Sequence, residues 1–266
     1  MTGSVRRPIR RVQADTVTDT RDALALEEPL EIRVDDLPLA VTMRTPGHDA
    51  QLVLGFLLAE GVIRTAAEVA SLDTLGPQRN GNVAQVRLHT PADLRHLSRH
   101  VYTTAACGVC GKASIEAVLS GFEPAADGPT VPAAVLHGLP DTLRAAQAEF
   151  AHTGALHAAG LFDAHGRLTA VHEDIGRHNA VDKVLGEALQ TGRVPLRDHI
   201  LLVSGRASFE IVHKALAGGI GLVAAISAPS SLAAELAQRG NVTLAGFVRG
   251  GSLNLYTHPG RVLTAG

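Results

Sequence analysis

Apolar and polar positions alternate with a period of two in much of the first third of the chain, as in half-buried β-strands. Residues 29–45 predict two strands joined by a turn at Asp35 and Asp36, and residues 82–89 predict a third strand. Between them, residues 47–61 carry apolar side chains at helical spacing, so we expect a helix that ends at Gly61. The first part of the chain therefore mixes strands and helix.

The second half of the chain follows another pattern. Residues 155–174 predict a β-hairpin, and Asn179 is a suitable N-cap for the helix after it. Short apolar runs then alternate with helical segments in the order strand, helix, strand, helix, strand. This order is typical of a largely parallel sheet covered by helices. We expect an α/β fold with a three-layer sheet and covering helices, plus a smaller N-terminal α+β domain.

Composition suggests where these domains begin and end. Residues 1–25 are polar, and we expect a disordered tail. Residues 26–132 would form the N-terminal α+β domain, which ends in a Gly- and Pro-rich link at 121–132. Residues 133–266 would form the α/β domain, which starts with a helix over 141–153 capped by Asp141.

Size and charge limit the function classes. The chain has 266 residues, 45% hydrophobic and 19% charged, as in a soluble globular protein with a sizeable core. Its formal net charge of -2 gives no overall attraction to nucleic acid or to a membrane surface. The N-terminal arginines lack the apolar run of an export signal, and no stretch approaches the roughly 20 apolar residues of a membrane span. We therefore expect a cytoplasmic protein whose thiols are reduced.

Both cysteines of the chain, Cys107 and Cys110, lie in the segment AACGVCGKASIE (105–116). A short predicted helix begins near Lys112, and a helix N-terminus and an ammonium group both favour thiolate over thiol. The neighbouring glycines would let a partner approach. The segment predicts a redox pair, half of a metal site, or a nucleophile that carries a group.

The segment can be compared with the sequence patterns of three known kinds of cysteine site. A thioredoxin-like site follows the first strand of a βαβ unit, whereas here two predicted strands and a helix come first. A zinc deaminase needs H-x-E upstream of P-C-x-x-C, an order that the chain lacks. A zinc site stays open, because His96 and His100 precede the cysteines in the pattern H-x3-H-x6-C-x2-C.

Small polar residues follow each strand of the predicted βαβαβ unit. Ligands bind beyond the carboxyl ends of parallel strands, where helix N-termini favour phosphate, so we expect one rim that binds a nucleotide-bearing ligand. Phe247 could stack on a base, Arg249 could pair with a phosphate, and Gly250–Gly251 would allow close backbone approach. The other rim residues are Ser204, Gly205, Arg206 and Ser208 after one strand, and Ser227–Ser231 after the next.

The segment VHEDIGRHNAVDKVLG (171–186) holds two histidines, three acids and Arg177. Such a mixture could bind a polar ligand or transfer protons. Helix capping beside a solvated turn would use the same residue types. The local pattern leaves both interpretations open.

Five segments together resemble the FdhD/NarQ family, the formate dehydrogenase accessory sulfurtransferases. The match runs in chain order from the N-terminal hairpin to near the C-terminus. The segments are AACGVCGKASIE, VHEDIGRHNAVDKVLG, VSGRASFEIVHKA, ISAPSSLA and GFVRGGSLNLYTH.

The resemblance implies a sulfur carrier that formate dehydrogenase requires for activity. A cysteine desulfurase would pass a persulfide to Cys107, with Cys110 as its partner. The sulfur would go to the bis-molybdopterin guanine dinucleotide (bis-MGD) form of the molybdenum cofactor, before that cofactor enters formate dehydrogenase. The resemblance also implies a homodimer, a fold similar to cytidine deaminases without their zinc, and no permanent metal. Residues implied to line the cofactor site are Phe247, Val248, Arg249, Gly250, Gly251 and Ser252.

Two further hypotheses follow. Lysine is rare here, with Lys112, Lys183 and Lys214 as the only three among 24 basic residues, and each lies in a segment singled out above. We hypothesise that these ammonium groups lie near the cofactor phosphates or the persulfide. The alternative to sulfur transfer is a non-catalytic chaperone for the cofactor, whose cysteines hold zinc or dock a partner.

Overall fold

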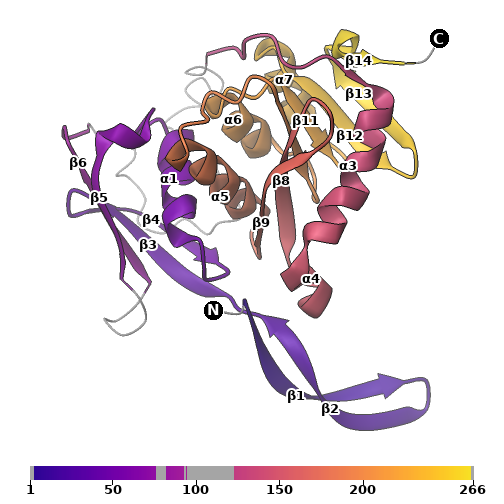
Figure 1. Ribbon diagram of the computed structural model, residues 1–266. Helices are drawn as coiled ribbons and strands as arrows, with labels where there is room; N and C mark the ends of the chain where they lie inside the picture. The colour runs from indigo at the N-terminus through magenta and orange to yellow at the C-terminus, as the bar shows by residue number, and fades with distance from the viewer. Residues whose placement is uncertain (1–2, 76–81, 93, 95–122, 265–266) are drawn as a thin grey trace.

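The computed structural model describes residues 3–75, 82–92, 94 and 123–264 (Figure 1). Outside these ranges lie His96, His100, Cys107, Cys110 and Lys112. The roles predicted for these five residues therefore stay predictions. Among the helices of the described ranges, none is both long and apolar enough to cross a membrane.

A four-stranded sheet, in the order β4-β3-β6-β5, forms the N-terminal part of the body. Its hairpin turns at Asp35 and Asp36, as predicted, and both residues have the positive φ angles (47° and 69°) that a tight two-residue turn needs. Strand β6 pairs with β3 in parallel. The elements are β3 (Glu28–Val34), β4 (Leu37–Arg44), helix α1 (Asp49–Ala59), the 3-10 turn η1 (Ala66–Glu68), β5 (Val69–Leu75) and β6 (Val83–Leu88).

A six-stranded sheet, in the order β13-β12-β11-β10-β8-β9, organises the second half. Strands β10, β11 and β12 are parallel as predicted, and β8 and β9 form the hairpin predicted over 155–174. With β13 also antiparallel, the prediction of a largely parallel sheet is wrong for the sheet as a whole. The reason is connection length, because β8 and β9, like β12 and β13, are joined by short turns that permit only antiparallel pairing. The strands are β8 (His157–Asp163), β9 (Leu168–Asp174), β10 (His199–Val203), β11 (Leu222–Ala225), β12 (Thr243–Arg249) and β13 (Ser252–Thr257).

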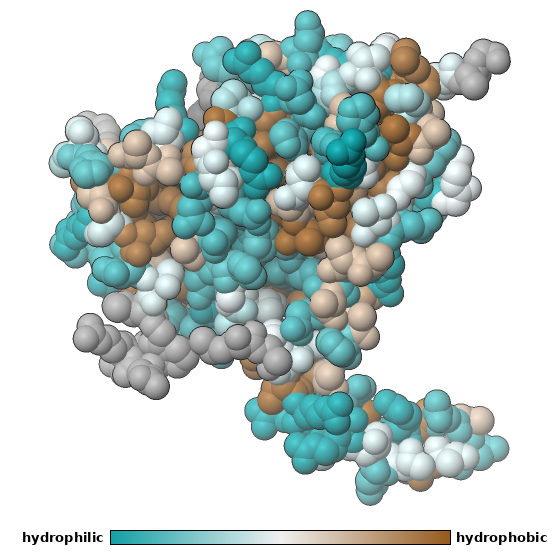
Figure 2. Space-filling view, in the orientation of Figure 1, coloured by the Kyte–Doolittle hydropathy of each residue, from teal (hydrophilic) through white to brown (hydrophobic). Residues whose placement is uncertain are grey.

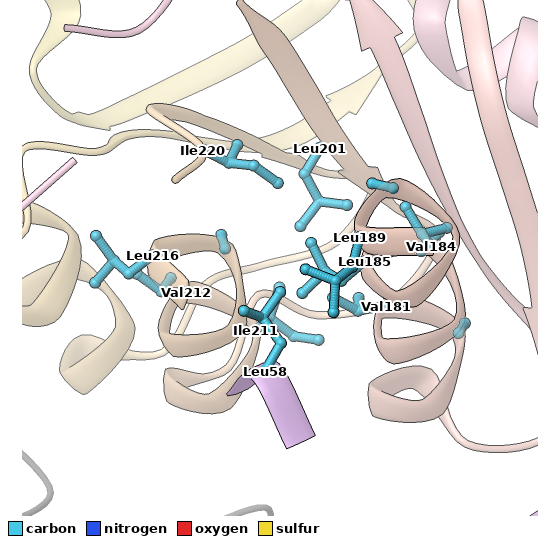
Figure 3. Packing of buried hydrophobic residues seen from close by; sticks show 14 of the residues in the cluster. Leu58, Val181, Val184, Leu185, Leu189, Leu201, Ile211, Val212, Leu216 and Ile220 are labelled. Atoms are coloured by element: carbon cyan, nitrogen blue, oxygen red, sulfur yellow. The ribbon is translucent and has the colours of Figure 1, made fainter. Parts of the chain in front are cut away.

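Helices cover both faces of this sheet, which gives three layers. Successive side chains of β10 point to opposite faces: Leu202 packs in the cluster that contains α3, and Leu201 packs in the cluster that contains α5 and α6. Figure 3 shows the second cluster, where side chains of α5, α6 and β10 meet Leu58 of α1. The predicted three-layer α/β arrangement is thus present, and the likeness to cytidine deaminases stays a prediction. The helices are α3 (Ala133–Ala146), α5 (Arg177–Gln190), α6 (Phe209–Ala217) and α7 (Ser231–Arg239).

Two helix starts differ from the prediction. Helix α3 begins eight residues before Asp141, directly after Pro132, and α4 (Ala148–Thr153) continues it after a break. Helix α5 begins at Arg177, so Asn179 lies inside it, where its amide donates to Met43 O at 2.7 Å. The side chain of Asn179 therefore makes a tertiary hydrogen bond and does not cap the helix. Strand β14 (Val262–Leu263), which follows the 3-10 turn η3 (Pro259–Arg261), pairs in parallel with β7 (Val131–Pro132) and so connects the start of α3 to the C-terminal segment.

Residues 4–25 form a hairpin arm of β1 (Ser4–Gln13) and β2 (Thr16–Ala25), which projects from the body (Figure 1). The prediction of a disordered tail is therefore wrong. Its surface is mostly hydrophilic in Figure 2, which explains why composition suggested disorder. Cross-strand partners supply the order: Arg10 pairs with Asp19 at 2.9 Å, and Val12 lies opposite Val17.

Helices α1 and α5 cross in direct backbone contact and join the two halves of the chain. A Cβ atom on Gly55 would overlap the carbonyl oxygen of Asp182, and one on Gly186 would overlap the carbonyl oxygen of Gln51. One hydrophobic core also runs from Leu30 and Ile32 of the first sheet to the helices of the second. The regions 26–132 and 133–266 therefore share a core.

Candidate functional site

The three parallel strands β10, β11 and β12 end at the same edge of the sheet, and the loops after them are hydrogen-bonded to one another. Ala207 N donates to Ala228 O at 3.2 Å, and Ser230 N donates back to Ala207 O at 3.0 Å. Phe247 N donates to Ser227 O at 3.1 Å. The strand ends that we expected to converge do so, and we call Ser204–Ser208, Ser227–Ser230 and Phe247–Ser252 the rim.

Phe247 has an unusual backbone conformation at the rim. Its φ is 53°, inside a β-bulge between Gly246 and Arg249. Bulky residues at positive φ are strained by roughly 1–3 kcal/mol, and such strain gathers at functional sites. The guanidinium carbon of Arg249 lies 5.5 Å from the centre of the Phe247 ring, in cation–π range. An aromatic face and a cation thus lie together at the edge of the sheet.

The remaining residues of this hairpin divide between turn and core. Gly250 and Gly251 form the turn, with φ of 57° and 73°, and both are exposed together with Ser252. Two positive φ angles in succession favour glycine. The side chain of Val248 is fully buried in the core under α3. Of the six residues predicted for the cofactor site, Val248 can therefore offer only its backbone.

His157, which the sequence did not single out, lies at the other end of the rim. Strand β8 runs antiparallel to β10 with Ala159 opposite Val203, so His157 extends two residues beyond β10. Desolvation, followed by the positive charges of Arg177 and Arg206, lowers the pKa of His157. The imidazole is accordingly neutral at pH 7 and lies close to two guanidinium groups.

Helix α5 brings Arg177 and His178 to this end. His178 Nε2 lies 3.2 Å from Ser208 Oγ and 3.7 Å from Glu210 Oε2. Burial alone would raise the pKa of Glu210, but hydrogen bonds from Ser208 and a backbone amide, together with the charges of His178 and Arg177, lower it. Glu210 is therefore ionised, and it is engaged at the start of α6.

The same 171–186 segment also faces the first half of the chain. Lys183 Nζ lies 2.7 Å from Asp174 Oδ2 and donates to the carbonyl oxygens of Thr45 (2.9 Å) and Glu173 (3.3 Å). An ammonium group has three protons, so these three acceptors satisfy it fully. Lys214 Nζ pairs with Asp182 Oδ1 at 2.6 Å.

For Lys183 and Lys214, these contacts contradict the part of the lysine hypothesis that concerns cofactor phosphates at the rim; the part that concerns the persulfide depends on Cys107, which lies outside the described residues. Lys183 and Lys214 are 1% and 4% exposed, and each is sealed in an ion pair. Neither can reach a ligand on the rim. We call the contact of α1 and β4 with α5, α6 and β9 the seam.

Two histidines complete the seam. The ring of His48, at the start of α1, meets His172 of β9 edge-on with 4.5 Å between ring centroids. His172 Nε2 lies 2.8 Å from Glu187 Oε2. Burial and the neighbouring His48 lower the pKa of His172 to about 4, although Glu187 opposes this. His172 is therefore a neutral hydrogen-bond donor at pH 7.

The residues that the structure describes contain no group of three or more His, Cys, Asp or Glu placed to hold a metal ion. The zinc pattern of the sequence lies outside those residues, so it stays a prediction.

Comparison with known proteins decides the family. The model of the FdhD/NarQ family matches residues 25–263. The chain belongs to the FdhD/NarQ family. The resemblance seen in the five segments is thus confirmed.

Relatives in this family match over nearly their full length. Sulfur carrier protein FdhD of Mycobacterium tuberculosis is 50% identical, over 96% of this chain and 97% of that protein. The protein of the same name from Nocardia farcinica is also 50% identical, over 98% and 96%. A crystal structure of a candidate formate dehydrogenase accessory protein from Desulfotalea psychrophila aligns with a TM-score of 0.78 at 28% identity, over 98% and 99% of the chains. That solved structure thus shares the fold described above.

Proposed function

We propose that the protein is a sulfur carrier in the maturation of formate dehydrogenase, and that its substrate is the molybdenum cofactor in its bis-MGD form. The observation that carries the proposal is the 50% identity to sulfur carrier protein FdhD over nearly the whole of both chains. The rim supports the cofactor part, because it combines converging strand ends with an aromatic ring and a guanidinium group. A cysteine desulfurase and formate dehydrogenase would be its partners, and it would act in the cytoplasm as a homodimer.

In this proposal sulfur enters at Cys107. The Cys107 thiolate attacks the outer sulfur of the desulfurase persulfide, a new S–S bond forms at Cys107, and the desulfurase thiolate leaves. One S–S bond replaces another, so loading needs no oxidant or reductant. Lys112, five residues along the sequence, supplies positive charge that favours the thiolate.

Delivery uses the second cysteine. The Cys110 thiolate attacks the inner sulfur of the Cys107 persulfide, which forms a Cys107–Cys110 disulfide and releases the outer sulfur as hydrosulfide for the metal of the substrate. The two thiols thereby supply the two electrons that turn persulfide sulfur into sulfide. A cellular dithiol reductant then restores both thiols.

The rim would hold the guanine nucleotide end of the cofactor. The Phe247 ring stacks on the base, and Arg249 pairs with a phosphate. The exposed Gly250–Gly251 turn lets the ligand approach the backbone. The buried side chain of Val248 anchors the hairpin that presents these groups.

Persulfide labelling followed by mass spectrometry tests the sulfur step. The full chain is incubated with a cysteine desulfurase and cysteine, and Cys107→Ala is compared with Cys110→Ala. We expect one added sulfur atom at Cys107 in the wild type and in Cys110→Ala, and none in Cys107→Ala. A chain that gains no sulfur and instead binds one zinc would support the chaperone alternative and contradict sulfur transfer.

A further inference from the structure

The end of the rim beside β8 carries two guanidinium groups that the proposed nucleotide contacts do not use. Among the described residues, neither Arg177 nor Arg206 lies within salt-bridge distance of a carboxylate. Arg206 is exposed, at the carboxyl end of β10. Arg177 is mostly buried, and its Nε atom is fully buried with no hydrogen-bond partner within the same ranges.

The orphan Nε of Arg177 points to a missing acceptor. Buried donors are almost always paired in folded proteins, and an unpaired one is destabilising. A guanidinium presents its N–H groups as a planar fork that fits the oxygens of a phosphate. An oxyanion at this position would satisfy the donor that the described part of the chain leaves unpaired.

The backbone of Gly205 separates the groups of this cluster. A Cβ atom placed there would lie 3.4 Å from His157 Nδ1 and 3.7 Å from Arg177 Cδ. Arg206 is the next residue, and its charge and that of Arg177 both act on His157. His157, Arg177 and Arg206 thus surround one short stretch of backbone.

The two carboxylates nearest this cluster, Asp174 and Glu210, are each engaged by other donors. Asp174 is buried in its ion pair with Lys183. Glu210 is engaged by Ser208 and lies 3.7 Å from His178. The N-termini of α5 and α6 add partial positive charge at the same end.

We propose that Arg177, Arg206 and His157 form a second anion subsite, which binds a diphosphate group of the nucleotide-bearing substrate. The proposal extends the cofactor part of the proposed function. Strand β8 lies three strand spacings from β12, or about 14 Å, so this subsite is separate from Phe247 and Arg249. A substrate with two dinucleotide arms, such as bis-MGD, has an anionic group for each end of the rim.

Calorimetric titration of the full chain with inorganic pyrophosphate and with GDP tests the proposal. The test variants are Arg177→Gln and Arg206→Gln, and the control is Arg197→Gln, because Arg197 is also exposed and precedes the opposite end of β10. We expect the two test variants to weaken pyrophosphate binding about tenfold or more, as for loss of a charge-assisted hydrogen bond. The control should stay within about twofold of the wild type.

Two further variants keep the outcome decisive. Arg177→Lys retains the charge and the fold but lacks the planar fork, so its pyrophosphate affinity should fall between that of the wild type and Arg177→Gln. Arg249→Gln should weaken GDP binding, and it should weaken pyrophosphate binding less than Arg177→Gln does. Absence of pyrophosphate binding by the wild type overturns the proposal, as does equal weakening in Arg197→Gln or Arg249→Gln. Persulfide labelling is independent of this titration, so failure of one leaves the other standing.

Discussion

The seam and the rim use residues of one segment, 171–186, in opposite ways. At the seam, Asp174, Asn179 and Lys183 are buried and every donor of the lysine finds an acceptor. At the rim, the buried Nε of Arg177 has no hydrogen-bond partner among the described residues, and farther along Phe247 holds a strained backbone. Buried groups whose hydrogen bonds are all made stabilise the fold, whereas an unpaired donor and a strained backbone are features of sites that bind a ligand.

This difference explains why a segment dense in charged residues is not a single site. Helix α5 places Asn179, Asp182, Lys183 and Gly186 in the interior, while its first turn reaches the carboxyl end of β10. Substitutions at the seam and at the rim should therefore affect different properties of the protein. Those at the seam should change the free energy of unfolding, and those at the rim should change ligand binding.

The helix crossing at the seam should show the largest effect. Gly55→Ala and Gly186→Ala each place a methyl group on a backbone carbonyl of the opposing helix, so the helices must move apart. We expect each variant to lose about 4 kcal/mol of unfolding free energy or more, above the usual range for overpacking. Urea denaturation followed by circular dichroism measures this loss.

Gly138→Ala is the matched control for the crossing. Gly138 lies inside α3, and a Cβ atom there would have no neighbour within 4 Å in the part of the chain that the structure describes. Because alanine is the better helix former, this variant should gain about 0.5–1 kcal/mol. If Gly55→Ala and Gly138→Ala changed stability in the same direction, the helices would not be in backbone contact.

Loss of a buried charge should rank next. Lys183→Met removes the ammonium and leaves Asp174 buried with its donors from Thr45, Gly176 and Asn179. Breaking a buried ion pair is strongly destabilising, and we expect about 3 kcal/mol in the same denaturation experiment.

The control for this variant is an exposed ion pair. Arg239→Met breaks the pair with Glu235 at 2.6 Å on α7, where both side chains are about half exposed. It should change stability by about 0.5 kcal/mol or less. Similar losses in Lys183→Met and Arg239→Met would contradict a sealed seam.

The histidine contact makes the seam sensitive to acid. His172 has a folded-state pKa of about 4, below the 6.5 of an exposed histidine, so it binds its proton mainly when the chain unfolds. The neutral ring contributes fully to the free energy of unfolding above pH 6.5. This contribution is lost as the pH falls toward 4, by about 2 kcal/mol between pH 7 and pH 5. Burial raises the pKa of Asp182 to about 6, which works in the opposite direction over pH 6 to 3.8.

Comparing variants isolates the histidine from this opposing carboxyl. In His172→Gln the drop in stability between pH 7 and pH 5 should be smaller than in the wild type by that amount. The exposed His165 provides the control, because His165→Gln should keep the wild-type pH dependence. Denaturant unfolding at each pH measures both, and an unchanged slope in His172→Gln would show that its ring is not the acid-sensitive group.

Local patterns in the sequence predicted much of the fold. The hairpin at Asp35–Asp36, helix α1 and the order of strands and helices after residue 155 depend on turn residues and periodicity within a short window. The rim followed from one rule, since parallel strand ends meet at one edge of a sheet.

Pairing between distant segments could not be predicted in this way. The arm is ordered by cross-strand partners such as Arg10 and Asp19, and composition carries no information on register. The acceptors of Lys183 lie in β9 and at Thr45, directly after β4. The rarity of lysine in the sequence suggested a ligand contact, whereas the tertiary structure buries this ammonium in an ion pair. His157 became visible only when β8 was placed beside β10.

A smaller effect on stability is expected at the rim, where two variants of Phe247 separate backbone strain from ligand contact. Phe247→Gly and Phe247→Ala both remove the ring, so GDP affinity should fall equally in the two variants. Glycine adopts a φ of 53° without strain, whereas alanine does not, so Phe247→Gly should be more stable than Phe247→Ala by about 1 kcal/mol. Urea denaturation and GDP titration of both variants measure the two quantities independently. If the alanine variant were the more stable of the two, the left-handed backbone at Phe247 would not be a source of strain, and the contrast between seam and rim would rest on Arg177 alone.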